Sequence, residues 1–456
     1  MGRLFGTDGI RGVANEAPLT PELTCRLGRV AASYLAERGG ATRGRPVLLI
    51  ARDTRVSGPL LEQALVAGIL SAGVDALVAG VLPTPAVAFL IPALGAAGGA
   101  VLSASHNPFE DNGVKLFSGE GDKLPDAWED EIERRLETGW EGARPTGARI
   151  GRVRAVRDAE RRYLDGLRSS LPVGFGLAGR RLVLDCAHGA TYRVAPRLFR
   201  SLGAEVWTLG SRPSGTNINR GVGALHPETL QARVRAAPGA SIGLAFDGDG
   251  DRLIVVDESG EVRDGDHVLA VCAGALLARG ELRGGVVVST VMANLGLERA
   301  LASLGIAMAR TTVGDRYVLE EMRRLGANLG GEQSGHVVFL DHARTGDGLL
   351  TALQLMRAVD EAGQPLSALA ARVEKCPQVL LNVRVRARPP LGELRGVAGA
   401  LARWEGKLDG RARFLVRYSG TEPVARVMVE GDDHTTIAAA ACEIAAAIRE
   451  EIGATS

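Results

Sequence analysis

Short apolar runs alternate with amphipathic runs along most of this chain, and no other sequence feature limits the possible folds as strongly. Residues 47–51, 76–80 and 99–103 have the apolar character of buried strands, and residues 59–71 have the pattern of a helix. Alternating strands and helices are typical of α/β proteins, in which helices cover a mostly parallel sheet. The sequence therefore predicts an α/β fold for most of its length.

Breaks in this alternation predict several domains. The chain has 456 residues, more than one ordinary hydrophobic core organises. A Gly-, Arg- and Pro-rich stretch near residues 144–154 ends the first βαβ passage, two similar passages follow, and the last part has a strand pair between two helices. We expect three α/β domains of similar topology and a smaller C-terminal α+β domain, with the ranges 1–150, 151–255, 256–372 and 373–456.

Composition excludes several classes of partner. Lys and Arg number 54 against 53 Asp and Glu, so charge gives no reason to expect nucleic acid or a membrane surface. The five cysteines are scattered and lack a CxxC spacing, which indicates reduced thiols and no zinc site. The N-terminal residues lack the apolar segment of a signal peptide, and the most apolar stretch, residues 59–81, is broken by polar residues. We expect a cytoplasmic protein with no nucleic-acid and no membrane partner.

The first strand–helix unit contains a dense polar cluster. Ser103, Ser105, His106 and Asn107 follow a strand-like run directly. A serine in such a loop can act as a nucleophile or phosphate carrier, although an ordinary Ser/Asn-rich turn has the same composition. Lys115 follows in a chain with only four lysines, and lysine, unlike arginine, can lose its proton when buried. A proton-transfer role and a chance placement both remain open.

Three aspartates alternate with glycines in Asp-Gly-Asp-Gly-Asp-Arg at residues 247–252. Carboxylates at i, i+2 and i+4 can converge on one hard cation, and their mutual repulsion would be costly without it. A calcium-binding EF-hand is excluded because Arg252 occupies the position that requires glycine, and strand-like residues follow where a helix should begin. The loop predicts a Mg²⁺ site on Asp247, Asp249 and Asp251 with room for a phosphate oxygen.

Further polar loops could bind a sugar phosphate. Glu332, Ser334 and His336 alternate and could present three polar groups to sugar hydroxyls, although a glycine-rich turn looks alike. Arg11 and Arg316 follow glycine-containing turns. The loop at residues 417–423 combines an arginine, hydroxyls and a glycine, which suits either a phosphate cradle or an ordinary hairpin.

Five motifs together resemble those of the α-D-phosphohexomutase superfamily, and the resemblance extends from Gly6 to Glu430. They are Gly-Thr-Asp-Gly-Ile-Arg-Gly at 6–12, Ser-Ala-Ser-His-Asn-Pro at 103–108, Asp-Gly-Asp-Gly-Asp-Arg at 247–252, Gly-Glu-Gln-Ser-Gly-His at 331–336 and Arg-Tyr-Ser-Gly-Thr-Glu-Pro at 417–423. The resemblance implies four domains around a central cleft, three of them sharing one α/β topology.

The resemblance also implies a role for each motif residue. Ser105, not Ser103, is expected to carry a phosphoryl group as phosphoserine. Mg²⁺ is expected on Asp247, Asp249, Asp251 and an oxygen of Ser105 or its phosphate. The other implied catalytic residues are Lys115 as acid and base, with Arg11, His106 and Arg252 around the reaction centre. The implied substrate contacts are Glu332, Ser334 and His336 for the sugar, and Arg417, Ser419, Gly420 and Thr421 for the non-reacting phosphate. Arg316 is a further expected substrate contact, from its own local sequence.

Gln333 indicates the glucosamine branch, because the phosphomannomutase/phosphoglucomutase branch usually has methionine there. The implied reaction interconverts glucosamine 6-phosphate and glucosamine 1-phosphate through a bound hexosamine 1,6-bisphosphate, and would feed amino-sugar nucleotide and cell-wall precursor synthesis. A phosphomannomutase/phosphoglucomutase, a non-catalytic phosphosugar-binding relative and a metal-dependent phosphatase stay open as alternatives. We expect sugar phosphates as partners, and a homodimer is left open.

Overall fold

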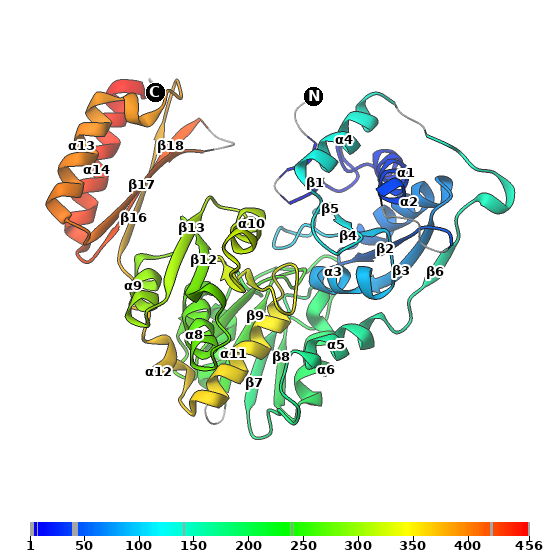
Figure 1. Ribbon diagram of the computed structural model, residues 1–456, viewed down its shortest axis with the longest axis horizontal. Helices are drawn as coiled ribbons and strands as arrows, with labels where there is room; N and C mark the ends of the chain where they lie inside the picture. Colours follow the sequence, from blue (N-terminus) through cyan, green and yellow to red (C-terminus); the bar gives the residue numbers. More distant parts are fainter. Residues whose placement is uncertain are drawn as a thin grey trace.

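Four β-sheets follow one another along the chain in the described part of this computed structural model, which comprises residues 4–6, 8–38, 44–139, 142–237, 239, 241–419 and 423–454. The first sheet lies opposite the C-terminal sheet, and the second and third sheets lie between and below them (Figure 1). No helix in these ranges combines the length and apolarity that crossing a bilayer requires. All five cysteines are free thiols.

The first sheet has the strand order β1-β5-β4-β2-β3-β6. Its strands are β1 (Ile10–Val13), β2 (Val47–Arg52), β3 (Asp75–Val81), β4 (Gly98–Leu102), β5 (Asp111–Ser118) and β6 (Val153–Ala155). Its helices are α1 (Pro21–Arg38), α2 (Gly58–Ser71), α3 (Thr84–Ala93) and α4 (Asp126–Glu137). Strands β2, β3, β4 and β6 are parallel, whereas β5 runs antiparallel to both β4 and β1.

The second and third sheets have the orders β11-β10-β9-β7-β8 and β13-β12-β14-β15. The second unit contains α5 (Ala159–Ser169), β7 (Arg181–Asp185), α6 (Val194–Ser201), β8 (Glu205–Leu209), α7 (Glu228–Ala236), β9 (Ser241–Phe246), β10 (Leu253–Val256) and β11 (Val262–Arg263). The third contains α8 (Gly265–Ala278), β12 (Val286–Thr290), α9 (Leu295–Ser303), β13 (Ala307–Thr311), α10 (Asp315–Leu325), β14 (Leu329–Gly331), β15 (Val337–Phe339), α11 (Gly348–Ala362) and α12 (Leu366–Ala370).

The predicted similarity of the three α/β units is confirmed at the level of topology. In each unit a parallel pair lies beside a third parallel strand, and an antiparallel strand follows that third strand: β3-β2-β4-β5, β8-β7-β9-β10 and β13-β12-β14-β15. The domain boundaries remain predictions. Strand β6 lies beyond the predicted limit at residue 150 and β11 beyond that at residue 255, so each limit falls a few residues before the end of its sheet.

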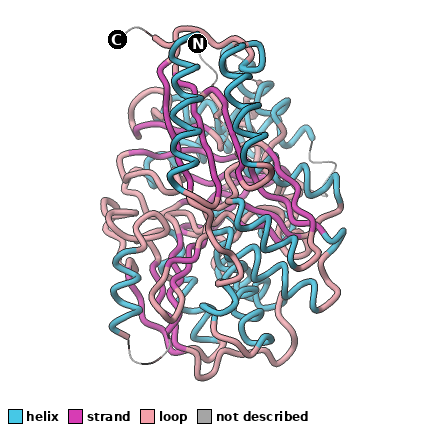
Figure 2. The backbone as a smooth tube through the Cα atoms, turned by 90° about the vertical axis from the view of Figure 1, so that its left-hand side faces the viewer, coloured by secondary structure: helices cyan, strands magenta, loops and turns pink. Residues whose placement is uncertain are grey.

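The C-terminal unit is a smaller α+β structure. Its antiparallel sheet has the order β16-β18-β17 and consists of β16 (Gln378–Arg384), β17 (Ala412–Tyr418) and β18 (Val424–Gly431). Helices α13 (Arg395–Leu408) and α14 (His434–Ile452) cover its outer face (Figures 1 and 2). Helix α13 begins after a short 3₁₀ turn, Leu391–Glu393, which follows two prolines.

Hydrophobic packing joins the first three units and leaves the fourth separate. One apolar core contains residues of the second and third units and one face of the first sheet, including Leu49, Phe117 and α3. The C-terminal unit has its own core between its sheet and its two helices. The fourth unit is therefore held to the others mainly by contacts outside these cores.

Helices α1 and α2 cross at two glycines. A Cβ on Gly28 would lie 2.3 Å from the Leu65 carbonyl oxygen, and a Cβ on Gly68 would lie 2.0 Å from the Cys25 carbonyl oxygen. The backbones of the two helices therefore touch, and no larger residue fits without moving one helix.

We expect Gly68→Ala to destabilise the first unit by roughly 1–3 kcal/mol, because the added methyl group overpacks this crossing. Thermal unfolding followed by circular dichroism measures the effect. Gly406→Ala is the matched control, since a Cβ at this helical position meets no atom within 4 Å. The control should be neutral or raise stability by about 0.4–1 kcal/mol, and equal losses for both variants would contradict the close crossing.

Candidate active site

The loops that carry the predicted site residues occupy the same position in the three α/β units. Each connects the last parallel strand to the antiparallel strand beside it: residues 103–110 join β4 to β5, residues 247–252 join β9 to β10, and residues 332–336 join β14 to β15. The loops meet, because Ser105 Oγ donates to Asp247 Oδ2 at 2.6 Å and the Leu253 N–H donates to the Gly335 carbonyl at 3.0 Å. One loop from each unit therefore builds a shared site.

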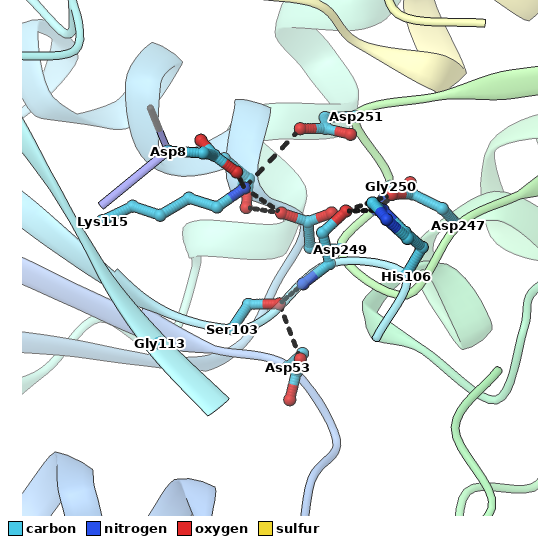
Figure 3. A network of polar contacts seen from close by, with 12 residues as sticks. Asp8, Asp53, Ser103, His106, Gly113, Lys115, Asp247, Asp249, Gly250 and Asp251 are labelled. Carbon is cyan, nitrogen blue, oxygen red and sulfur yellow. Dashed lines mark hydrogen bonds and ion pairs between the residues drawn. The ribbon is translucent and has the colours of Figure 1, made fainter. Parts of the chain in front are cut away.

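Ser105 lies within this site in a strained backbone conformation. Its φ of 51° is in the left-handed region, which costs a non-glycine residue of the order of 1–3 kcal/mol. Its N–H donates to Ser103 Oγ at 2.9 Å, and Ser103 Oγ donates to Asp53 Oδ2 at 2.6 Å (Figure 3). Of the two serines, Ser105 faces the aspartate loop, and Ser103 supports its backbone.

A fully buried arginine, Arg55, holds the serine loop in place. Its Nε donates to Asp53 Oδ2 at 2.8 Å, and both residues are 0% exposed. Its terminal nitrogens donate to four loop carbonyls, those of Ser105, Asn107, Pro108 and Asp111. The sequence analysis did not select Arg55. A signal was present, because Asp53, Thr54 and Arg55 follow the apolar strand β2 directly, just as the serine motif follows β4.

The second unit supports the serine loop from the other side. Asn219 Nδ2 donates to the carbonyl oxygens of Ser105 and Asn107, both at 2.9 Å. A Cβ on Gly248 would lie 2.4 Å from the Ser105 carbonyl oxygen, so this close approach requires glycine. The serine loop is thus clamped between the first two units. Asn219 was not predicted, and a lone asparagine in a polar loop carries no distinguishing signal.

Asp247, Asp249 and Asp251 converge, with one oxygen from each lying within 4.8 Å of the others and all three residues buried. Asp249 Oδ1 and Asp251 Oδ1 have no hydrogen-bond partner among the described residues. Burial raises the pKa of Asp247 well above its ordinary value, and the charges of Asp251 and Asp249 raise it further. Unpaired carboxylate oxygens this close together fit a hard divalent cation, so these residues could hold a metal ion.

Lys115 approaches the aspartates from the first unit (Figure 3). Its Nζ lies 2.8 Å from Asp249 Oδ2 and 2.9 Å from Asp8 Oδ2. Burial by itself would lower the pKa of Lys115, but Asp249, Asp8 and Asp251 outweigh burial and hold the pKa well above its ordinary value. Lys115 is thus a charged hydrogen-bond donor to these carboxylates, and its role as acid and base stays a prediction.

A cavity of about 530 Å³ opens between the first and third units beside these residues. Six predicted site residues line it: Arg11, His106, Asp251, Arg252, Glu332 and His336. Ser105 is 1% exposed and lies beneath the lining, with its Oγ 3.3 Å from His106 Nδ1. Burial, followed by the charges of Arg252 and Arg11, lowers the pKa of His106 to about 4, so its imidazole is neutral at neutral pH.

Lys123 and two aspartates also belong to this site, although the sequence analysis did not select them. Lys123 lines the cavity, and its Nζ donates to Asp8 Oδ1 and Asp315 Oδ2, both at 2.5 Å. The contact between Lys123 and Asp315 joins the first unit to the third across the cavity. The rarity of lysine in this chain is the signal that could have found Lys123.

Four predicted substrate residues do not line the cavity. Arg316, at the start of α10, pairs with Asp126 and lies 3.3 Å from Glu129, both on α4 of the first unit. Ser334 is exposed. Arg417 and Ser419 lie in the C-terminal unit, which stands apart from the first unit (Figure 1). Gly420 and Thr421 lie outside the described residues.

We expect Arg55→Ala to destabilise the protein by roughly 3–5 kcal/mol, because it leaves the buried charge of Asp53 without its partner. Chemical denaturation measures this loss. Arg154→Ala is the control: Arg154 pairs with Asp75 at 2.9 Å but is 59% exposed, and such surface pairs contribute about 0–1 kcal/mol. A loss no larger than that of the control would contradict the role of Arg55 in holding the loop.

Comparison with known families places the whole chain in one of them. Four family models match in order: phosphoglucomutase/phosphomannomutase alpha/beta/alpha domain I at residues 2–142, domain II at 161–260, domain III at 264–376 and the C-terminal domain at 380–447. A crystal structure of a phosphoglucomutase/phosphomannomutase family protein from Burkholderia thailandensis has a TM-score of 0.81 and 26% identity, covering 98% of this chain and 97% of that one.

Named relatives are similar over the full length. A phosphoglucosamine mutase of Desulforudis audaxviator is 52% identical over 452 residues, which cover 99% of this chain and 98% of that protein. A phosphoglucosamine mutase of Myxococcus xanthus is 50% identical over 451 residues, which cover 99% and 97%. The chain therefore belongs to the phosphoglucomutase/phosphomannomutase family, within its phosphoglucosamine mutase group.

Proposed function

We propose that this chain interconverts glucosamine 6-phosphate and glucosamine 1-phosphate by phosphoryl transfer through Ser105. The observation that carries the proposal is the contact between Ser105 Oγ and Asp247 Oδ2, because it sets a hydroxyl against a carboxylate cluster beside a cavity. Relatives 50–52% identical over nearly all of the chain are named phosphoglucosamine mutase. The product would supply amino-sugar nucleotide and cell-wall precursor synthesis.

The proposed metal ion is Mg²⁺, held by Asp247, Asp249 and Asp251 with an oxygen of Ser105 or its phosphate. These oxygens are the ligand type that magnesium prefers, and two of them are buried without a hydrogen-bond partner among the described residues. When bound, the ion would neutralise negative charge that develops on the transferring phosphoryl group.

In the first transfer, phosphorylated Ser105 gives its phosphoryl group to the free hydroxyl of a bound sugar monophosphate. The bond from phosphorus to Ser105 Oγ breaks, and a bond from phosphorus to the sugar oxygen forms. The sugar hydroxyl loses a proton and Ser105 Oγ gains one. His106, which is neutral, can accept a proton, and charged Lys115 can supply one.

The cavity walls provide contacts for the rest of the substrate. Arg11 and Arg252 can donate to phosphate oxygens. Glu332 and His336, from the third unit, can bind sugar hydroxyls. The sugar bisphosphate then turns round and returns its other phosphoryl group to Ser105, which restores the phosphoserine and releases the isomeric monophosphate.

The non-reacting phosphate needs its own clamp in both orientations. We propose Arg417, Ser419, Gly420 and Thr421 for this task, as the family resemblance implies. Since the C-terminal unit contributes nothing to the cavity lining among the described residues, it must approach the cavity when the substrate is bound. Such closure would also exclude water from the phosphoserine. Cytoplasmic location and a homodimer remain predictions.

A panel of sugar phosphates tests the proposal. With Mg²⁺ and a trace of bisphosphate primer, the wild-type protein should convert glucosamine 6-phosphate faster than glucose 6-phosphate or mannose 6-phosphate. Preference for either of the latter two would assign the chain to phosphoglucomutase or phosphomannomutase activity instead.

Ser105→Ala should lose turnover by at least roughly 10²–10³ and should lack phosphoserine in mass spectrometry, while circular dichroism stays unchanged. Ser118→Ala is the matched control, because Ser118 is a buried serine of the same unit whose Oγ has no hydrogen-bond partner among the described residues. Near-normal turnover of Ser105→Ala would exclude Ser105 as the phosphate carrier.

Metal removal has a readout that does not depend on turnover. After treatment with a chelator, adding Mg²⁺ should raise the thermal unfolding midpoint, because the ion binds only the folded aspartate cluster. The gain is about 2.7 kcal/mol at a hundredfold excess over the dissociation constant. Asp249→Asn should reduce this gain, and an unchanged midpoint in the wild type would argue against a metal site.

A further inference from the structure

A chain of buried polar contacts runs from the loop at residues 332–336 to the start of the C-terminal unit. Gln333 Nε2 donates to Asp266 Oδ2 at 3.1 Å, and the same oxygen accepts the backbone N–H of Asn294 at 2.9 Å. Asn294 Oδ1 accepts the N–H of Cys376 at 2.9 Å, and its Nδ2 donates to the Cys376 carbonyl at 3.1 Å. Cys376 lies two residues before β16, so the contacts connect the loop to the linker of the C-terminal unit.

Asp266 is the central member of this chain. It is 0% exposed, and burial, followed by the charge of Asp264, raises its pKa to about 7. Burying a carboxyl group costs free energy unless its partners compensate. Among the described residues, the two donors to the Asp266 carboxyl come from outside its own helix, one from the loop and one from the start of α9. The carboxyl therefore joins two other segments and does not cap α8.

The backbone around Asp266 leaves little room for independent movement. The N–H of Gly265 donates to the Gln333 carbonyl at 3.0 Å, and a Cβ on Gly265 would lie 2.0 Å from the Glu332 carbonyl oxygen. On the other side, Lys375 of the linker pairs with Asp264. Residues 264–266 thus contact both the loop and the linker.

The end of the C-terminal sheet that faces the third unit, here called its base, is polar, and it contacts Asn294 as well. Glu430 of β18 is 0% exposed and accepts from Arg413 Nη2 at 2.8 Å and from the N–H of Leu295 at 3.2 Å. Asn294 Nδ2 lies 3.4 Å from Glu430 Oε1. Because this unit has its own hydrophobic core, polar contacts at its base set its orientation.

We propose that Gln333, Asp266 and Asn294 are positioning residues that couple the conformation of the 332–336 loop to the orientation of the C-terminal unit. The inference rests on the proposed function, since it takes this loop as the sugar site and the C-terminal unit as the phosphate clamp. Gln333 is not among the described residues that line the cavity. Gln333 acts through Asp266. A bound sugar that moves Glu332 and His336 also displaces Gln333, which lies between them in the sequence. The hydrogen bonds through Asp266 and Asn294 then shift Cys376.

Hydrogen–deuterium exchange measured by mass spectrometry tests the coupling on the full-length protein. Glucosamine 6-phosphate with Mg²⁺ should change exchange in peptides that cover residues 372–377, where the Cys376 N–H is held by Asn294. Gln333→Met removes the donor to Asp266 and should abolish this response, with a fall in kcat/KM of roughly five- to twentyfold. Gln231→Met is the matched control, since Gln231 donates to the Gly260 carbonyl at 2.8 Å in the second unit.

A second comparison uses Asp266→Ala, which interrupts the same chain. The double variant with Gln333→Met should lose no more activity than the more impaired of the two single variants, because the effects of substitutions within one network are not additive. If the fold-losses in activity of the two single variants multiply in the double variant, the two residues act independently, and the proposed coupling through Asp266 (the relay) is overturned.

The outcomes separate the relay from the proposed function. A wild-type enzyme that turns over glucosamine 6-phosphate without any change of exchange at the linker, or a Gln333→Met variant that responds like the wild type, overturns the relay and leaves the function intact. A linker response that Gln333→Met abolishes, in a protein that does not convert glucosamine 6-phosphate, supports the relay and overturns the proposed reaction.

Discussion

The packing of three carboxylates against one lysine inside the protein is the interaction on which the rest of the site depends. Buried negative charges repel one another strongly where the dielectric constant is low. Lys115, from the first unit, compensates part of this repulsion, because its ammonium group pairs with Asp249 and Asp251 of the second unit and with Asp8 of the first. The balance of charge therefore also joins the two units. In the described residues, one oxygen each of Asp249 and Asp251 has no hydrogen-bond partner, and Asp247 of the same cluster contacts Ser105, an arrangement that suits metal-assisted phosphoryl transfer.

One topology used three times explains how such distant residues meet. In each α/β unit the chain turns back after the last parallel strand into an antiparallel neighbour, which leaves one loop at the same edge of each sheet. The three loops share a position but not a sequence: one carries a serine, one the aspartates, and one Glu332 and His336. Repetition of the fold thus supplies the location, and divergence of the loops supplies the separate chemical groups. The buried Arg55 shows that the serine loop needs added support to keep its strained backbone.

The C-terminal unit follows a different physical plan. The first three units are joined by apolar packing, whereas the fourth has its own core and a polar base around Glu430 and Asn294. Hydrogen bonds at a base of this kind depend on distance and angle, so they constrain the direction of the unit. In the proposed reaction this plan suits a clamp that must open for the substrate and close over an intermediate that turns round.

The sequence alone determined the features that depend on neighbouring residues. Alternating apolar and amphipathic runs predicted the α/β units, and the close spacing of Asp247, Asp249 and Asp251 in a glycine turn predicted their convergence, because local geometry is enough for both.

Only the tertiary structure decided which distant groups meet. Ser105 and Asp247 lie 142 residues apart in the chain, and neither motif by itself shows that they touch; only the family resemblance implied a shared metal site. The supports Arg55, Asn219 and Lys123 belong to none of the five motifs. Arg316 stays a predicted substrate contact, and only the tertiary structure reveals its ion pairs with Asp126 and Glu129 of the first unit. The physical reason is that hydrophobic packing between units sets these distances, and no short stretch of sequence contains that information.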